Sequence, residues 1–202
     1  MALSVSDERR HEIARLAVSR FAVQGFDGTS MSDLARHVGL SKAGIYHYFP
    51  TKEAILAEAL LEYSERLLST VLQAAAGDGE PVERLGRVIG AILALYRDAD
   101  AYHQVQINDL ARLAPADQEI IRANERQVVR VMEGVLARLE RDIDEVTLKA
   151  LTMSVFGILN WKARWFRDGP GRLDLGDYIT LVTEFVAGGV VRVARTSLET
   201  PR

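Results

Sequence analysis

Apolar residues recur at helical spacing along nearly the whole chain, and no other feature restricts the possible fold as strongly. In a helix, side chains three or four residues apart share a face, so such a stripe marks the side that is buried. The stripe of the first segment, 6–24, consists of Ile13, Leu16, Ala17 and Phe21. Pro and Gly separate the segments, and no run alternates polar and apolar residues for long enough to form a strand. The sequence therefore predicts an all-α fold.

Turn and cap signals divide this pattern into about nine helices. Ser, Thr and Asp precede several segments, where their side chains can cap a helix, and Gly25 and Gly39 follow the ends of two others. We expect helices at 6–24, 31–38, 42–49, 52–75, 81–97, 101–113, 115–141, 145–167 and 175–197. The clearest loop in the sequence is at 168–171.

Length and composition exclude several classes of protein. A chain of 202 residues can bury a core without metal or disulfide support. It has no cysteine, which excludes disulfides, a thiolate nucleophile and cysteine-ligated zinc. The first residues are charged where a signal peptide is apolar, and no apolar run approaches the ~18 residues that span a bilayer. We therefore expect a cytoplasmic protein with no membrane partner.

Charge is distributed unevenly along the chain. Residues 1–52 carry seven Lys or Arg and five Asp or Glu, a net charge of +2, whereas residues 53–202 carry 18 and 23, a net charge of −5. A small basic part ahead of a large acidic part suits a protein that touches a polyanion at one end, although such a difference also arises by chance. We expect one domain at 1–52 and another at 53–202.

Two short helices joined by a tight turn and followed by a long helix are typical of a helix-turn-helix. The second short helix would place its N-terminal residues in the major groove of DNA. Those residues are small or can donate hydrogen bonds: Ser41, Lys42, Ala43 and Gly44. Donors suited to phosphate oxygens follow at Tyr46, His47, Tyr48 and Lys52. The periodicity alone fits a surface helix with a few aromatic residues equally well.

This region resembles the TetR family of transcriptional regulators. The resemblance lies in the stretch 29–56, in the residues leading into it, and in the spacing of Gly39, Ser41, Tyr46, Phe49, Lys52 and Leu56. It implies that Ser30 and Thr51 cap helices and that Lys52 contacts a phosphate. The residues expected at the DNA interface are Ser30, Ser41, Lys42, Ala43, Gly44, Tyr46, His47, Tyr48, Thr51 and Lys52. The chain departs from the common family pattern at Ala43, Gly44 and Tyr48, which would alter the operator sequence.

We expect a homodimer for two physical reasons. One reading helix covers too few base pairs for specificity, and a symmetric partner supplies the second half-site of a palindromic operator. The predicted helix at 145–167 has little polar face, so it would cover its own core on one side and a partner on another. Its apolar residues include Val146, Leu148, Leu151, Val155, Phe156, Ile158, Leu159 and Trp161. The family resemblance likewise implies that the last two helices form a four-helix bundle with a second subunit.

We expect a small-molecule effector to bind within 53–202. Asn160 and Arg164 share one face of the helix at 145–167, and Trp161 and Trp165 share the next. This segment resembles TetR-family regulators that respond to acyl-CoA thioesters, which need an apolar slot and cationic donors. The donors available are Lys162, Arg164, Arg167 and Arg172. Alternatively, the tryptophans pack in a core or interface and Arg164 pairs with a carboxylate.

The full set of effector candidates draws on three predicted helices. They are Tyr96, Tyr102, His103, Gln106, Phe156, Asn160, Trp161, Arg164 and Trp165. The sequence contains no catalytic constellation, no Gly-rich phosphate loop and no metal-ligand spacing. We therefore expect a ligand-responsive repressor that is not an enzyme and carries no metal or cofactor. The alternative is a helical protein-binding or architectural DNA-binding module without an effector.

Overall fold

The computed structural model of this chain describes residues 5–97, 100–167 and 172–199. Over these residues it contains nine α-helices, one short 3-10 helix and no strand, which confirms the all-α prediction. The elements are α1 (Val5–Gln24), α2 (Met31–His37), α3 (Lys42–Tyr48), α4 (Lys52–Ala75), α5 (Pro81–Arg97), α6 (Asp100–Asp109), η1 (Leu110–Arg112), α7 (Pro115–Leu136), α8 (Glu145–Trp165) and α9 (Leu175–Glu199). The loop predicted at 168–171 lies outside the described residues.

Two helices end earlier than their periodicity predicts. The helix α6 ends at Asp109 and continues as η1, whereas one helix was expected to reach residue 113. The helix α7 ends at Leu136 and not near residue 141. There the backbone N–H of Leu139 donates to the carbonyl of Leu136, an i→i+3 bond that tightens the last turn. After this turn, Leu139 packs against the core of the second unit. The spacing of apolar residues in the sequence does not reveal this contact.

Glycines in the left-handed region end the first two helices. Gly25 has φ +76° and Gly39 has φ +71°, values that a side chain disfavours. Gly25 also donates its N–H to the carbonyl of Phe21 at 2.8 Å. The ring of Phe26 packs back on that of Phe21, with centroids 5.0 Å apart, as the predicted helix end requires.

The chain divides into two compact units, and each unit is built from two separate segments of the sequence. The first unit contains 1–66 and 99–124, and the second contains 67–98 and 125–202. The helices α4 and α7 therefore supply residues to both units. The domains predicted at 1–52 and 53–202 are functional divisions, and they stay a prediction beside these packing units.

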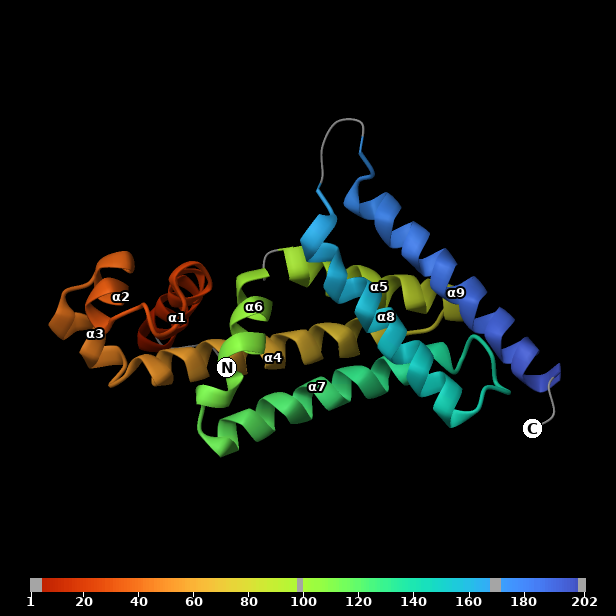
Figure 1. Ribbon diagram of the computed structural model, residues 1–202, viewed down its shortest axis with the longest axis horizontal. Helices are drawn as coiled ribbons and strands as arrows, with labels where there is room; N and C mark the ends of the chain where they lie inside the picture. The colour runs from red at the N-terminus through yellow and green to blue at the C-terminus, as the bar shows by residue number, and fades with distance from the viewer. Residues whose placement is uncertain (1–4, 98–99, 168–171, 200–202) are drawn as a thin grey trace. The chain divides into compact units, whose positions relative to one another are not determined.

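In the first unit, α1, α2 and α3 gather around the beginning of α4 (Figure 1), and α6 packs against α1. The core of this group is formed by apolar side chains that every helix turns inward. Its most completely buried large members are Ile13, Phe21, Leu34, Ile45, Phe49, Ile55, Leu56, Leu60 and Tyr63. Each fully buried side chain of this kind stabilises the fold by about 1.5–3 kcal/mol.

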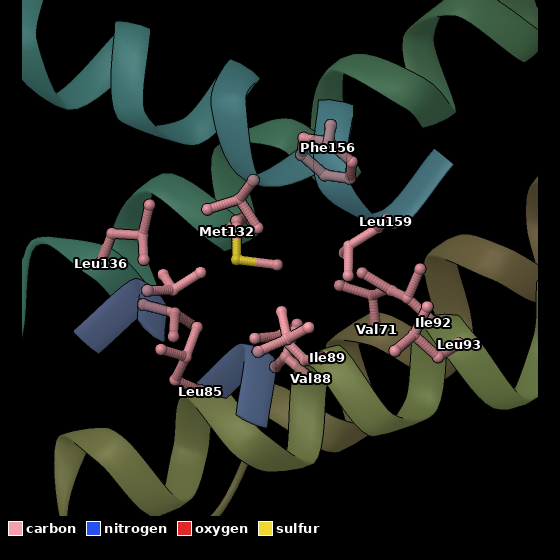
Figure 2. Packing of buried hydrophobic residues seen from close by; sticks show 14 of the residues in the cluster. Val71, Leu85, Val88, Ile89, Ile92, Leu93, Met132, Leu136, Phe156 and Leu159 are labelled. Carbon is pink, nitrogen blue, oxygen red and sulfur yellow. The ribbon is translucent and has the colours of Figure 1, made fainter. Parts of the chain in front are cut away.

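In the second unit, α9 packs along α5, and α8 packs on both. Figure 2 shows Val88, Ile89 and Ile92 of α5 directed toward Met132 of α7 and Leu159 of α8. The helices α8 and α9 each bury one face only. Their exposed large apolar residues are Val146, Met153, Trp161, Trp165, Leu181, Phe185 and Val193. None of the described helices is long and apolar enough to cross a membrane.

Candidate nucleic-acid interface

The helix α2 begins with a reciprocal cap between Ser30 and Asp33. The Ser30 hydroxyl oxygen accepts the Asp33 N–H at 3.1 Å, and the Asp33 carboxylate accepts the Ser30 N–H at 3.2 Å. The carboxylate also accepts the Ser30 hydroxyl at 2.6 Å. These hydrogen bonds lower the pKa of Asp33, because they favour the charged form. The start of α2, and with it the turn into α3, is therefore fixed by local chemistry.

The helix α3 has one buried and one exposed face. Ile45 is fully buried, and so is Phe49 just past the helix end. The opposite face exposes Lys42, Ala43, Tyr46 and His47, while Tyr48 is half-buried with its ring against that of His47. Small and hydrogen-bonding side chains therefore project from a helix whose other face is anchored.

Ser41 and Gly44 form the cap of α3. The Ser41 hydroxyl accepts the Gly44 N–H at 3.0 Å. A Cβ at position 44 would lie 3.2 Å from that hydroxyl oxygen, which is tighter than ordinary contact. The sequence suggested that Gly44 allows close approach to DNA. The structure gives it a second reason, because a larger residue would crowd the cap.

Thr51 and Lys52 connect the start of α4 to the rest of the unit. The Thr51 hydroxyl accepts the Ala54 N–H at 3.1 Å and so caps α4. The Lys52 ammonium donates to the carbonyls of Phe26 at 2.9 Å and Thr29 at 3.2 Å. An ammonium has three donors, so one is left for the phosphate contact that the sequence predicts. Its contacts with the turn before α2 were not anticipated.

Two consecutive arginines of α1 bind the carboxyl ends of the two short helices. Arg9 donates at 3.1 Å to the carbonyl of Val38, which is the C-cap residue of α2. Arg10 donates to the carbonyl of Tyr48, the last residue of α3. Arg10 also donates to Glu58 of α4 at 2.9 Å, and its guanidinium lies 4.3 Å from the centre of the Phe49 ring. A cation at a helix carboxyl end is favoured by the helix dipole. Arg10 therefore ties α1, α3 and α4 together.

The effector candidates of α8 lie mostly on its exposed face. Trp161 is 61% exposed and Trp165 54% exposed, and Asn160 and Arg164 are also exposed. These side chains therefore point away from the core of the second unit, because α8 turns only one side inward, and their role in binding an effector stays a prediction. Of this group only Phe156 faces the core.

An aromatic cluster lies where α8 ends and α9 begins. The ring of Tyr178 is 5.5 Å from Trp165 and 4.9 Å from Phe166, centroid to centroid. Lys162 is only 7% exposed, and its ammonium lies 5.1 Å from the centre of the Phe166 ring. The cluster thus combines flat apolar faces with a cation, and a ligand-binding role for this segment stays a prediction.

The second group of effector candidates is divided between the two units. Tyr96 belongs to the second unit, where burial and the nearby Glu125 raise its pKa to about 12. Tyr102 belongs to the first unit and stacks on Tyr63 with centroids 5.0 Å apart. Burial raises the pKa of Tyr102 as well. The remaining two candidates, His103 and Gln106, are half-buried in the first unit. Among the described residues, no group of three His, Asp or Glu side chains can hold a metal ion.

Two family models match the chain and together cover most of it. Residues 13–59 match "Bacterial regulatory proteins, tetR family", and residues 78–190 match "Tetracyclin repressor-like, C-terminal domain". The chain belongs to the TetR family. The first match contains the helix-turn-helix and the start of α4, and the second contains α5 to most of α9, so both predicted parts carry the family's features.

Individual relatives of this TetR-family chain are distant. The HTH-type transcriptional repressor KstR2 of Mycobacterium tuberculosis (strain ATCC 25618 / H37Rv) is 29% identical over 101 residues, which make up 50% of this chain and 48% of that protein. The chain thus spans about half the length of the curated relatives that it matches first.

Solved TetR-family structures match over nearly the whole chain. A TetR-family regulator from Bordetella parapertussis 12822 has a TM-score of 0.79 at 27% identity, covering 88% of this chain and 93% of that one. AibR, solved with isovaleryl coenzyme A and operator DNA, has a TM-score of 0.70 at 24% identity, covering 90% and 97%. At this identity the similarity to AibR shows a shared fold and nothing more.

Sequence reasoning about this TetR-family chain missed the residues that hold the motif from outside. Arg9 and Arg10 belong to the first helix, and the sequence pattern assigned them no role. Their partners, Val38, Tyr48 and Glu58, are 29, 38 and 48 residues away. The one available signal was an arginine pair three and four residues before Ile13, where the apolar stripe begins, and such a pair by itself identifies no partner.

Proposed function

We propose that this TetR-family protein is a ligand-responsive transcriptional repressor that binds a palindromic operator as a homodimer in the cytoplasm. The observation that supports DNA binding is the arrangement of α3. Its exposed face carries Lys42, Tyr46 and His47, while its inner face, its cap and its carboxyl end are all held by the rest of the unit. A rigid helix with outward donors can enter a major groove without first being ordered.

The proposed interface consists of the predicted residues in two roles. Lys42, Ala43 and Tyr46 lie where the amino end of a reading helix meets base edges. His47, Tyr48 and the remaining donor of Lys52 are suited to phosphate oxygens. Ser30, Ser41, Gly44 and Thr51 form the caps that support these residues.

The experiment that tests DNA binding is selection of duplexes from a random library by the purified protein. The proposal expects an inverted repeat whose half-sites are spaced by about one helical turn or a multiple of it. Affinity for that duplex should fall steeply as salt rises, because counterions are released from the phosphates. Recovery of no enriched duplex at low salt would contradict DNA binding.

We propose further that the effector is a coenzyme A thioester bound by the second unit. The support is chemical: the aromatic cluster of Trp165, Phe166 and Tyr178 offers flat apolar faces beside the cation of Lys162. AibR, of the same fold, was solved with isovaleryl coenzyme A. Exposed cations that can reach phosphates are Arg164, Arg167 and Arg172.

A thermal shift of the purified protein with a panel of acyl-CoA thioesters tests this effector class. A thioester at 100-fold excess over its dissociation constant should stabilise the fold by about 2.7 kcal/mol. Free acids and coenzyme A alone are the controls, and only the thioester should give the full shift. If the protein selects an operator but no thioester shifts its melting temperature, it is a repressor with another effector or with none.

A further inference from the structure

The turn between α1 and α2 is held from two sides by cations. The ring of Phe26, which is 3% exposed, lies in the middle of this turn. The Lys52 ammonium of α4 is 4.4 Å from the centre of that ring, and the Arg112 guanidinium of η1 is 5.0 Å from it. Cations over an aromatic face are attracted by its negative charge density. One buried ring thus connects the start of α4 with η1.

Arg112 also binds the same turn through a bidentate ion pair with Asp27. Its Nη1 and Nη2 lie 2.9 Å and 2.6 Å from the two carboxylate oxygens of Asp27. Its Nε donates to Asp109 at 2.8 Å. Both carboxylates raise the pKa of Arg112 by accepting these bonds. We call this group, Asp27, Arg112 and Asp109, the turn clasp.

The two carboxylates of the turn clasp have different surroundings. Asp109 is 6% exposed, so its charge depends on Arg112, whereas the Asp27 side chain is 76% exposed. An isolated ion pair with one partner so exposed contributes little to the free energy of unfolding. Here the guanidinium is already oriented by Asp109 and by the Phe26 ring, so the parallel pair with Asp27 forms without ordering a free arginine.

The turn clasp lies at a cleft between two helices that pack against each other elsewhere along their length. A cleft of about 520 Å³ lies between the end of α1 and α6, and both Asp27 and Arg112 line it. Across the same region, Gln104 donates to the carbonyl of Ala22 at 3.4 Å, which is a long bond. The charged, bidentate pair between Arg112 and Asp27 is a shorter link than this one, and it joins η1 to the turn before α2.

What the turn clasp holds is the entry to the helix-turn-helix. Two residues after Asp27 comes Thr29, which is fully buried and donates its hydroxyl to the carbonyl of Gly25. Ser30, the cap of α2, follows directly. A displaced turn would therefore shift the cap of α2, and α3 packs on α2.

We propose that Arg112 is a positioning residue for operator binding, which through Asp27 fixes the turn that sets the orientation of α2 and α3. This proposal rests on the proposed DNA binding. It predicts that Asp27→Asn weakens affinity for the selected operator by about five-fold, because an ion pair in a network typically couples by this amount.

The sign of this effect separates the proposal from simple electrostatics. Removing a negative charge from a DNA-binding unit would strengthen binding to a polyanion if Asp27 acted only through its charge. The turn clasp predicts weaker binding. Asp27→Glu keeps the carboxylate and should restore most of the affinity. Asp78→Asn, an exposed aspartate between α4 and α5, is the matched control and should change affinity little.

Arg112→Lys provides the second arm of a double-mutant cycle. It keeps the charge beside Asp109 but loses the two-pronged pairing, so it should weaken operator binding in the parent protein and have little further effect beside Asp27→Asn. Additive effects of the two substitutions would contradict the turn clasp, as would Asp27→Asn binding as well as or better than the parent.

Hydrogen exchange of the DNA-free protein separates failure of this inference from failure of DNA binding. Asp27→Asn should speed exchange of the Thr29 and Leu34 amides, which are bonded to Phe26 and Ser30, while amides of α5 keep their protection. Unchanged exchange at these amides overturns the turn clasp, whatever the protein does with DNA. If the parent protein selects no duplex, the proposed function fails, and faster exchange in Asp27→Asn still supports the clasp.

Discussion

Lys42 is the residue at which the proposed DNA reading is tested most simply. It is exposed at the start of α3, and the cap beneath it is made by Ser41 and Gly44. Its side chain therefore contributes to the surface and not to the support of the helix. Lys52 differs, because its ammonium already donates to two carbonyls of the preceding turn.

Lys42→Ala should lower operator affinity and leave the fold unchanged. If the lysine neutralises one phosphate, the slope of log affinity against log salt concentration should become shallower by about 0.9. Fluorescence anisotropy over a salt series measures both quantities. Lys149→Ala, in α8 of the second unit, is the control and should leave the slope as it is. An unaltered slope for Lys42→Ala would remove this residue from the phosphate contacts.

At the scale of elements, α3 is too short to be stable by itself. It has seven residues, well below the length at which an isolated helix persists in water. Its stability comes from the cap at Ser41, from burial of Ile45, and from the arginine that binds its last carbonyl. The reading helix is thus held by α1 and α4, which are 20 and 24 residues long.

Arg10→Gln should destabilise the first unit and weaken operator binding together. The substitution removes a charged hydrogen bond to Tyr48 and leaves the partly buried Glu58 without this partner. Losses of this kind lower the free energy of unfolding by about 1–3 kcal/mol. Urea denaturation followed by circular dichroism measures it. Arg138→Gln, an exposed arginine beyond α7, should be neutral, and equal stability of the two variants would show that Arg10 does not hold α3.

At the scale of the whole molecule, the outer faces of α8 and α9 expose large apolar side chains that the single chain does not cover. Phe185 is 68% exposed and Trp161 61% exposed, on helices whose inner faces are tightly packed. Large apolar patches of this kind mark interaction surfaces. A second copy of the chain, related by two-fold symmetry, would bury both faces and supply the second reading helix.

Phe185→Glu should convert a dimer into a folded monomer. The side chain touches solvent in the single chain, so the charge costs the subunit itself little, but it cannot be buried against a partner. Sedimentation equilibrium gives the mass, and circular dichroism checks the fold. Ile107→Glu, at a residue of α6 that is 73% exposed, is the control and should stay dimeric. A dimer that survives Phe185→Glu would place the interface elsewhere.

The sequence by itself determined the helices and the caps that begin or end several of them, because these depend on residues close together in the chain. Helical stripes, the Ser30 and Ser41 caps and the left-handed Gly25 and Gly39 all act within about four residues. The same locality made the outward residues of α3 predictable, since a buried Ile45 and Phe49 leave the other face to solvent.

Only the tertiary structure decided which polar groups support the motif and which faces stay open. Arg112 and Asp27 are 85 residues apart, and no periodicity relates them. The exposure of Trp161 depended equally on packing, because a helix that is apolar all round can bury either side. Long-range ion pairs and the choice of buried face follow from how complete helices meet, and that is settled by the shape and volume of the whole core.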